Sequence, residues 1–200
     1  MPKQASPDIP VPAPHNWRTT DEDEINRRRA RARSEDFRIS NADPQHPIFS
    51  NFRVRSGSGL TYTVEIRDLR QRQFACDCVD FRINGLGTCK HVEAVLLHLE
   101  ARFKRLFRAA EHTGSPRLDV VPESATDSIR LLGGDGAWPR ALRDWFGTDG
   151  TLRRGLPEEA IEALKQLDAD EAPGLRLSQE LGPWLESRRR AAERKLLRRD

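Results

Sequence analysis

One stretch of the chain, residues 74–96, reads FACDCVDFRINGLGTCKHVEAVL. It contains every cysteine of the 200 residues, at positions 76, 78 and 89, together with a histidine at position 91. Thiolate and imidazole are the ligands that a soft divalent ion such as Zn²⁺ prefers, and a structural site needs four of them in a tetrahedron. We therefore interpret Cys76, Cys78, Cys89 and His91 as the ligands of one structural zinc ion.

Local geometry allows the four side chains to converge. Residues i and i+2 of a strand face the same side, so Cys76 and Cys78 can meet at one ion if a strand carries both. The flexible segment Asn84-Gly85-Leu86-Gly87 can bring the chain back. Cys89 and His91 can converge if Cys89 lies at or before the first turn of a helix and His91 just within it, and Thr88 is a suitable cap for that helix.

Two other interpretations of the cluster stay open. Three buried free cysteines beside an unrelated histidine would require the ligand spacing to arise by chance. A catalytic cysteine with a histidine base would require only one thiol. Four protein ligands leave no position for water, so we expect the metal to hold structure, and we expect the chain to contain no catalytic residue and not to be an enzyme.

The residues before the cluster have the pattern of a small antiparallel sheet. Apolar and polar residues alternate over residues 52–55 and 60–67, and Ser56-Gly57-Ser58-Gly59 supplies a hairpin turn between them. A third short strand is expected to end at Cys76 and Cys78. After the cluster, apolar residues recur at helical spacing, which predicts one helix from about residue 90 to about residue 112.

These elements predict an α+β fold class: a small antiparallel sheet plus a long helix around a zinc site, then a mainly helical second region, and a disordered Pro-rich N-terminus. The expected segments are a disordered tail at 1–19, a charged and solvated helix or linker at 20–44, the zinc module at 45–112 and a C-terminal α+β or helical region at 115–200. In the last segment we expect strands at 117–121 and 128–132 and helices at 139–146, 157–169 and 178–198.

Basic residues are the second feature that bears on function. The 34 Lys and Arg residues exceed the 31 Asp and Glu residues by only three, but they gather in clusters at 27–33, at 102–108 and at 188–199. Such clusters either contact phosphates or are solvated helix faces balanced by nearby acids. The candidate nucleic-acid-binding residues are Arg102, Lys104 and Arg105 on the predicted zinc helix, with Arg53 and Arg55 on the sheet.

The quoted stretch resembles a SWIM zinc finger, in the version carried by bacterial Swi/Snf-type helicase-like ATPases, where the finger precedes the motor. The resemblance covers about residues 50–100 and includes all four ligand positions. It implies a module for DNA or protein contacts, with a Swi/Snf-type ATPase motor as a partner in cis or in trans. No Gly-x-x-x-x-Gly-Lys-[Ser/Thr] phosphate loop occurs, so we expect either the N-terminal portion of a longer ATPase or a stand-alone protein.

We expect DNA as the partner, with RNA as the second candidate and a protein-interaction adaptor as the alternative function. No small-molecule substrate and no membrane are expected. The chain has no run approaching the roughly 20 apolar residues of a membrane helix and no apolar N-terminal signal, which predicts a cytoplasmic location.

Overall fold

The computed structural model describes residues 19–123, 125–134 and 137–197, and the chain separates into one unit that ends at Thr113 and another that begins at Gly114. The α+β class with a small antiparallel sheet is confirmed. The tail expected at 1–19 lies outside the described residues apart from Thr19. No helix in the described ranges combines the length and apolar character needed to cross a bilayer.

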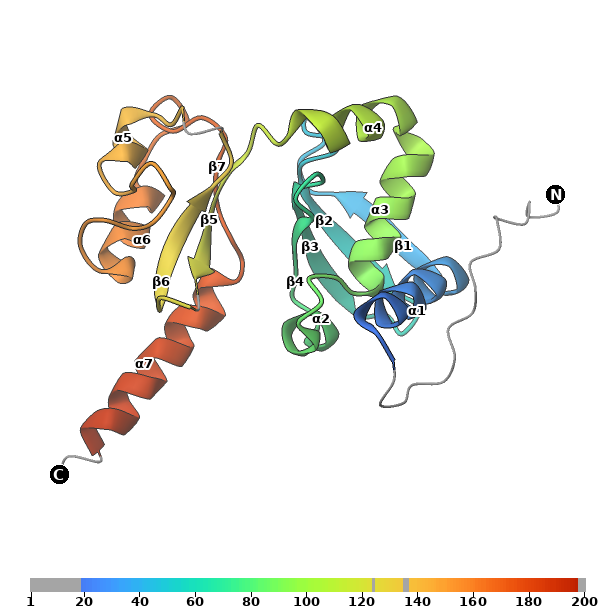
Figure 1. The fold of residues 1–200 in the computed structure, drawn as a ribbon, viewed down its shortest axis with the longest axis horizontal. Helices are drawn as coiled ribbons and strands as arrows, with labels where there is room; N and C mark the ends of the chain where they lie inside the picture. The colour runs from blue at the N-terminus through green and yellow to red at the C-terminus, as the bar shows by residue number, and fades with distance from the viewer. Residues whose placement is uncertain (1–18, 124, 135–136, 198–200) are drawn as a thin grey trace. The chain divides into compact units, whose positions relative to one another are not determined.

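The first unit is a four-stranded antiparallel sheet with helices on one face (Figure 1). Its strands, in spatial order, are β1 (Phe37–Asn41), β2 (Asn51–Ser56), β3 (Thr61–Asp68) and β4 (Gln73–Cys76). Its helices are α1 (Asp21–Ser34), α2 (Val79–Asn84), α3 (Lys90–Arg102) and α4 (Lys104–Thr113). The predicted hairpin joins β2 to β3, with Gly59 at a φ of 85° that favours glycine.

The core of this unit lies between the sheet and α3. Phe52 and Val54 of β2 are almost fully buried, whereas Arg53 and Arg55, which alternate with them, are exposed, as the alternation predicts. The other members of the core cluster come mainly from β3, β4 and α3. The apolar stripe of α3 therefore covers one face of the sheet, and the alternate residues of the strands project from the opposite face.

The single helix expected from residue 90 to residue 112 is wrong, because the chain breaks at Phe103 into α3 and α4. Phe103 has φ −126° and ψ 38°, outside the helical region. A straight helix of this length would extend for about 35 Å, which is longer than the β strands that it covers. The break allows Phe107 and Ala110 of α4 to join the core cluster.

The segment 20–44 contains the charged helix that we expected, but this helix is packed against the rest of the first unit and not simply solvated. Thr20 does cap α1, since its hydroxyl accepts the Asp23 N–H at 3.2 Å while the Asp23 carboxylate accepts the Thr20 N–H at 2.9 Å. However, α1 contacts α3, and β1 adds an edge strand to the sheet. Both elements belong to the first unit.

The second unit has a three-stranded sheet in which β5 (Leu118–Glu123) lies between β6 (Ser128–Leu132) and β7 (Leu175–Leu177). The pairing is antiparallel to β6 and parallel to β7, a short strand that the sequence did not predict. Its helices are α5 (Arg140–Arg143), α6 (Pro157–Lys165) and α7 (Leu181–Leu197). Three of the four tryptophans of the chain contribute to this core: Trp138 is buried and donates from Nε1 to the Gly133 carbonyl at 2.8 Å, while Trp145 and Trp184 are partly buried against it.

Candidate metal centre

The four predicted ligands come from three local structures. Cys76 ends β4, Cys78 is the N-cap residue of α2, and Cys89 is the N-cap residue of α3, whose first turn contains His91. The expectation that Cys89 lies at or before the first turn of the helix and His91 just within it is confirmed. Two other sequence expectations are wrong. Cys78 is not on the strand, because the chain leaves β4 after Cys76 and turns into α2, and Thr88 is not the cap of α3.

The four side chains converge at one buried point. Their ligand atoms all lie within 4.8 Å of one another, and His91 Nδ1 is 3.9 Å from Cys76 Sγ and 4.0 Å from Cys89 Sγ. Zinc bonds of about 2.0–2.3 Å place tetrahedral ligand atoms about 3.5–3.8 Å apart. Small side-chain movements suffice to reach that spacing, so the cluster could hold a metal ion.

The thiols strongly perturb one another's ionisation. The pKa of the Cys78 thiol lies well below its usual range, because the Cys76 and Cys89 thiols donate hydrogen bonds to its sulfur and the Phe81 N–H also donates to it at 3.3 Å. Contacts with Cys78 and Cys89, together with burial, raise the pKa of the Cys76 thiol. The pKa of Cys89 is raised to about 12, since its contact with Cys76, which lowers it, is outweighed by its contact with Cys78 and by burial. Without a metal the protein favours the thiolate of Cys78 alone, and a bound cation would also stabilise the thiolates of Cys76 and Cys89.

The imidazole of His91 is held between two aromatic rings. Tyr62 stacks on it with ring centroids 4.2 Å apart, and Phe37 meets it edge to face at 5.7 Å. With Nδ1 facing the thiols, the buried Nε2 has no hydrogen-bond partner within the described ranges. Metal-binding histidines are usually oriented by a hydrogen bond from the second ring nitrogen, so if His91 binds a metal, ring packing would take the place of that bond.

A buried carboxylate connects the ligand-bearing turn to its surroundings. Glu93, in the first turn of α3, is 5% exposed. It accepts hydrogen bonds from the Thr88 hydroxyl at 2.7 Å, from Arg72 at 3.2 Å and from Arg29 at 3.4 Å. The turn between β3 and β4, helix α1 and the residue before Cys89 therefore meet at one side chain.

Helix α1 is attached to the same region by further charge pairs. Arg28 makes a two-point contact with Asp80, at 2.6 and 3.0 Å, and Lys90 donates to Glu35 at 2.5 Å. Asp80 lies just after the first two ligands in the chain, and Lys90 lies between the last two. Within α1 Ala32 alone is buried, so its attachment depends mainly on ion pairs made to the segments that carry the ligands.

The predicted nucleic-acid-binding residues occupy two surfaces. Arg102 ends α3, and Lys104 and Arg105 begin α4; all three are exposed, and none forms an ion pair with a described residue. Arg53 and Arg55 are exposed on β2, on the sheet face opposite α3. The five residues therefore do not form one continuous surface: three lie at the junction of α3 and α4, and two lie on the outer face of the sheet.

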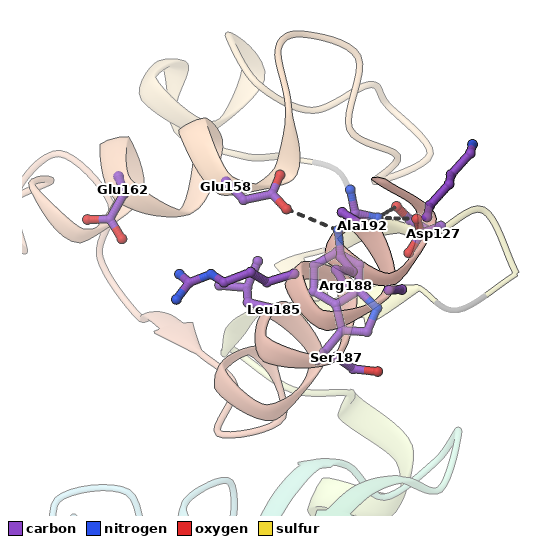
Figure 2. Close-up of a pocket in the computed structure, with 11 residues that line it drawn as sticks. Asp127, Glu158, Glu162, Leu185, Ser187, Arg188 and Ala192 are labelled. Atoms are coloured by element: carbon purple, nitrogen blue, oxygen red, sulfur yellow. Dashed lines mark hydrogen bonds and ion pairs between the residues drawn. The ribbon is translucent and has the colours of Figure 1, made fainter. Parts of the chain in front are cut away.

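The other two basic clusters differ: most arginines of α1 pair within the chain, whereas in the C-terminal cluster Arg188 and Arg190 pair with carboxylates and the other described basic residues form no ion pair with a described residue. Carboxylates pair with most arginines of α1, namely Arg27, Arg28, Arg29 and Arg31. In the second unit, Arg188 pairs with Asp127 and Glu158 and lies 4.8 Å from the Trp184 ring, beside a groove of about 800 Å³ between α6 and α7 (Figure 2). Residues 198 and 199 of that cluster lie outside the described residues.

The residues that surround the ligands were not predicted from the sequence. A signal for Tyr62 was present, because it alternates in phase with Val64, which pairs with Cys76 on the neighbouring strand. Phe37 lies in a five-residue edge strand within a segment that looked like a linker. The partners of Glu93 are distant in sequence, and no local pattern indicates them.

We expect Cys89→Ser to unfold the first unit and to leave residues 114–200 folded. Serine is a poor zinc ligand, and zinc contributes on the order of 10 kcal/mol to the folding of small zinc-dependent modules. Limited proteolysis should degrade the first unit and leave a resistant C-terminal fragment, and chelation of the wild-type protein should reproduce this pattern. Digestion spread evenly along the chain would contradict the division into two units.

We expect Tyr62→Ala to weaken metal binding by about 10- to 100-fold, the usual effect of removing a group that orients a ligand. Tyr62→Phe keeps the stacked ring and should leave the affinity nearly unchanged. Competition with a chromogenic chelator measures both affinities. Equal losses in the two variants would assign the effect to the hydroxyl group and contradict the stacking argument.

No family model, curated protein or solved structure matches the chain. The functional interpretation of the centre therefore rests on the ligand motif and on the geometry described above.

Proposed function

We propose that the first unit is a structural zinc module of the SWIM type that binds DNA and catalyses no reaction. The observation that carries the proposal is the convergence of four buried ligand atoms within 4.8 Å. Cys76, Cys78, Cys89 and His91 would hold the ion, which would link the end of β4 and the start of α2 to the start of α3. Four protein ligands leave no open position for a substrate or for an activated water.

The DNA part of the proposal is supported by the exposed charges on and beside α4. Arg102, Lys104 and Arg105 have no acidic partner among the described residues, whereas most arginines of α1 do. Phe107 and Ala110 anchor α4 in the core, while Arg102, Lys104 and Arg105 are all exposed to solvent. Contacts from such residues to phosphates are independent of sequence and weaken with added salt.

The motif's resemblance to fingers of bacterial Swi/Snf-type ATPases extends the proposal. The module would bind DNA for such a motor, in cis or in trans, with RNA as the second candidate ligand. The three cysteines are free thiols, which suits the reducing conditions of the cytoplasm. The proposal includes neither a small-molecule substrate nor a membrane.

A protein-interaction adaptor is the second candidate function, and one observation favours it. Val79 and Ile83 lie one turn apart on α2, directly after Cys78, and they are 60% and 77% exposed. Exposed apolar side chains placed side by side are typical of protein contacts. In this alternative the metal would fix α2 for a partner protein, and the finger would not touch DNA.

We expect reduced, unchelated protein to contain about one zinc per chain, as a four-ligand structural site requires. Binding needs deprotonated thiols and a neutral histidine, so protons compete with the metal and zinc should be released as the pH falls. Elemental analysis across a pH series measures both properties. Less than about half a zinc per chain near neutral pH would contradict the proposed site.

We expect the triple variant R102E/K104E/R105E to weaken duplex DNA binding by at least about tenfold at moderate salt, because three phosphate contacts become repulsive. The matched control is R33E/R70E/R82E, which reverses three exposed arginines elsewhere in the unit. Both are measured by DNA retention over a salt series. If DNA is not retained, and a protein partner is captured despite salt and nuclease but lost on V79S/I83S, the adaptor function is favoured.

A further inference from the structure

The sheet face opposite α3 carries three exposed arginines at neighbouring positions. Arg38 of β1 pairs directly with Arg55 of β2, and Arg53 lies two residues along the same strand. Neighbouring strands are about 4.8 Å apart, and residues i and i+2 are about 6.8 Å apart along a strand. The side chains of three arginines therefore leave the sheet within a small area of one face.

Hydroxyl groups surround these arginines. Ser40 pairs with Arg53 across β1 and β2, and on the other side Thr61 and Thr63 of β3 pair with Arg55 and Arg53. We call these six residues the outer-face patch: Arg38, Ser40, Arg53, Arg55, Thr61 and Thr63. None of the six residues is acidic. Asp77 borders the patch, where its carboxylate accepts the Thr63 N–H at 3.1 Å, and Glu65, the next residue along this face of β3, pairs with Arg67 at 2.6 Å.

The three arginines have no acidic partner among the described residues, as is also true of Arg33, Arg70 and Arg82, and what distinguishes them is that Arg38 lies directly opposite Arg55. Arg28, Arg29 and Arg72 each contact a carboxylate, whereas no described residue forms an ion pair with Arg38, Arg53 or Arg55. Like charges placed directly opposite one another on adjacent strands are destabilising. An anionic ligand lying across β1 and β2 would supply the missing charge.

We propose that the outer-face patch binds the phosphodiester backbone of double-stranded nucleic acid. This inference rests on the proposed DNA-binding function and assigns it a second surface, distinct from α4. Arg, Ser and Thr side chains are typical phosphate contacts. The patch faces away from the core that α4 joins through Phe107, so the two surfaces can be tested separately.

The composition of the patch favours a duplex over other polyanions. None of its six residues is aromatic, so it cannot stack unpaired bases as single-strand-binding surfaces do. A duplex also presents about one charge per 1.7 Å, twice the density of one strand. No large apolar side chain is present to enter a lipid bilayer, which binding to a membrane surface usually requires.

The test compares the full-length, metal-loaded protein with the triple variant R38Q/R53Q/R55Q. The matched control R33Q/R70Q/R82Q removes the same net charge from exposed arginines outside the patch. Fluorescence anisotropy over a salt series measures binding to a labelled duplex, to one of its strands and to vesicles containing anionic lipid. Metal content and thermal unfolding verify folding, and the patch variant should be at least as stable as wild type because it no longer has a like-charge pair.

We expect the patch variant to bind the duplex at least about tenfold more weakly at moderate salt. The slope of log K against log salt concentration should become shallower by up to about 2.7, which is about 0.9 for each phosphate that the protein no longer neutralises. The control should change much less. Equal losses in both triple variants, tighter binding to the single strand, or arginine-dependent binding to vesicles without duplex binding would each overturn the inference. If wild type binds the duplex and only R102E/K104E/R105E is impaired, the patch is wrong and the proposed function stands. If wild type binds no nucleic acid, both fail.

Discussion

The burial at one point of four side chains that could ligate a metal is the constraint on which the first unit depends. Burying polar groups is costly unless they are partnered, and three adjacent thiols cannot all ionise without a cation. The ligands come from the end of β4, the start of α2 and the start of α3, so their convergence fixes how the sheet and α3 meet. In such a module the free energy of metal binding is also free energy of folding.

The surroundings of the ligands extend this constraint to α1. This helix has almost no apolar face, yet Arg28 and Arg29 reach Asp80 and Glu93, and Lys90 reaches Glu35. The anchors on α2 and α3 occupy the same turns as the ligands. Ion pairs therefore link the position of α1 to the candidate metal centre. Because Arg28 and Arg29 of α1 make these ion pairs, they are not free to contact an external ligand.

Local patterns were sufficient to predict the ligands, the hairpin of β2 and β3 and the class of the fold, because strict alternation and the C-x-C and C-x-H spacings act over a few residues. Contacts distant in sequence were not predictable. Edge strand β1 is only five residues long, and the break at Phe103 follows from the size of the sheet that α3 covers. The capping role of Thr88 was predicted wrongly, because its hydroxyl bonds to a carboxylate whose other partners lie far along the chain.

Net charge conceals the property that distinguishes the arginines of this chain, which is whether each has an acidic partner. The net charge of +3 counts two kinds of arginine together: those of α1 that pair with carboxylates, and those on the outer-face patch and beside α4 that have no acidic partner among the described residues. The patch depends on the pairing of β1 with β2, which sets Arg38 against Arg55, and the opposite face of those strands packs on the core that contains Cys76 and Cys89. A metal ion bound by this cluster would therefore also help to hold in register the charges on the far side of the sheet.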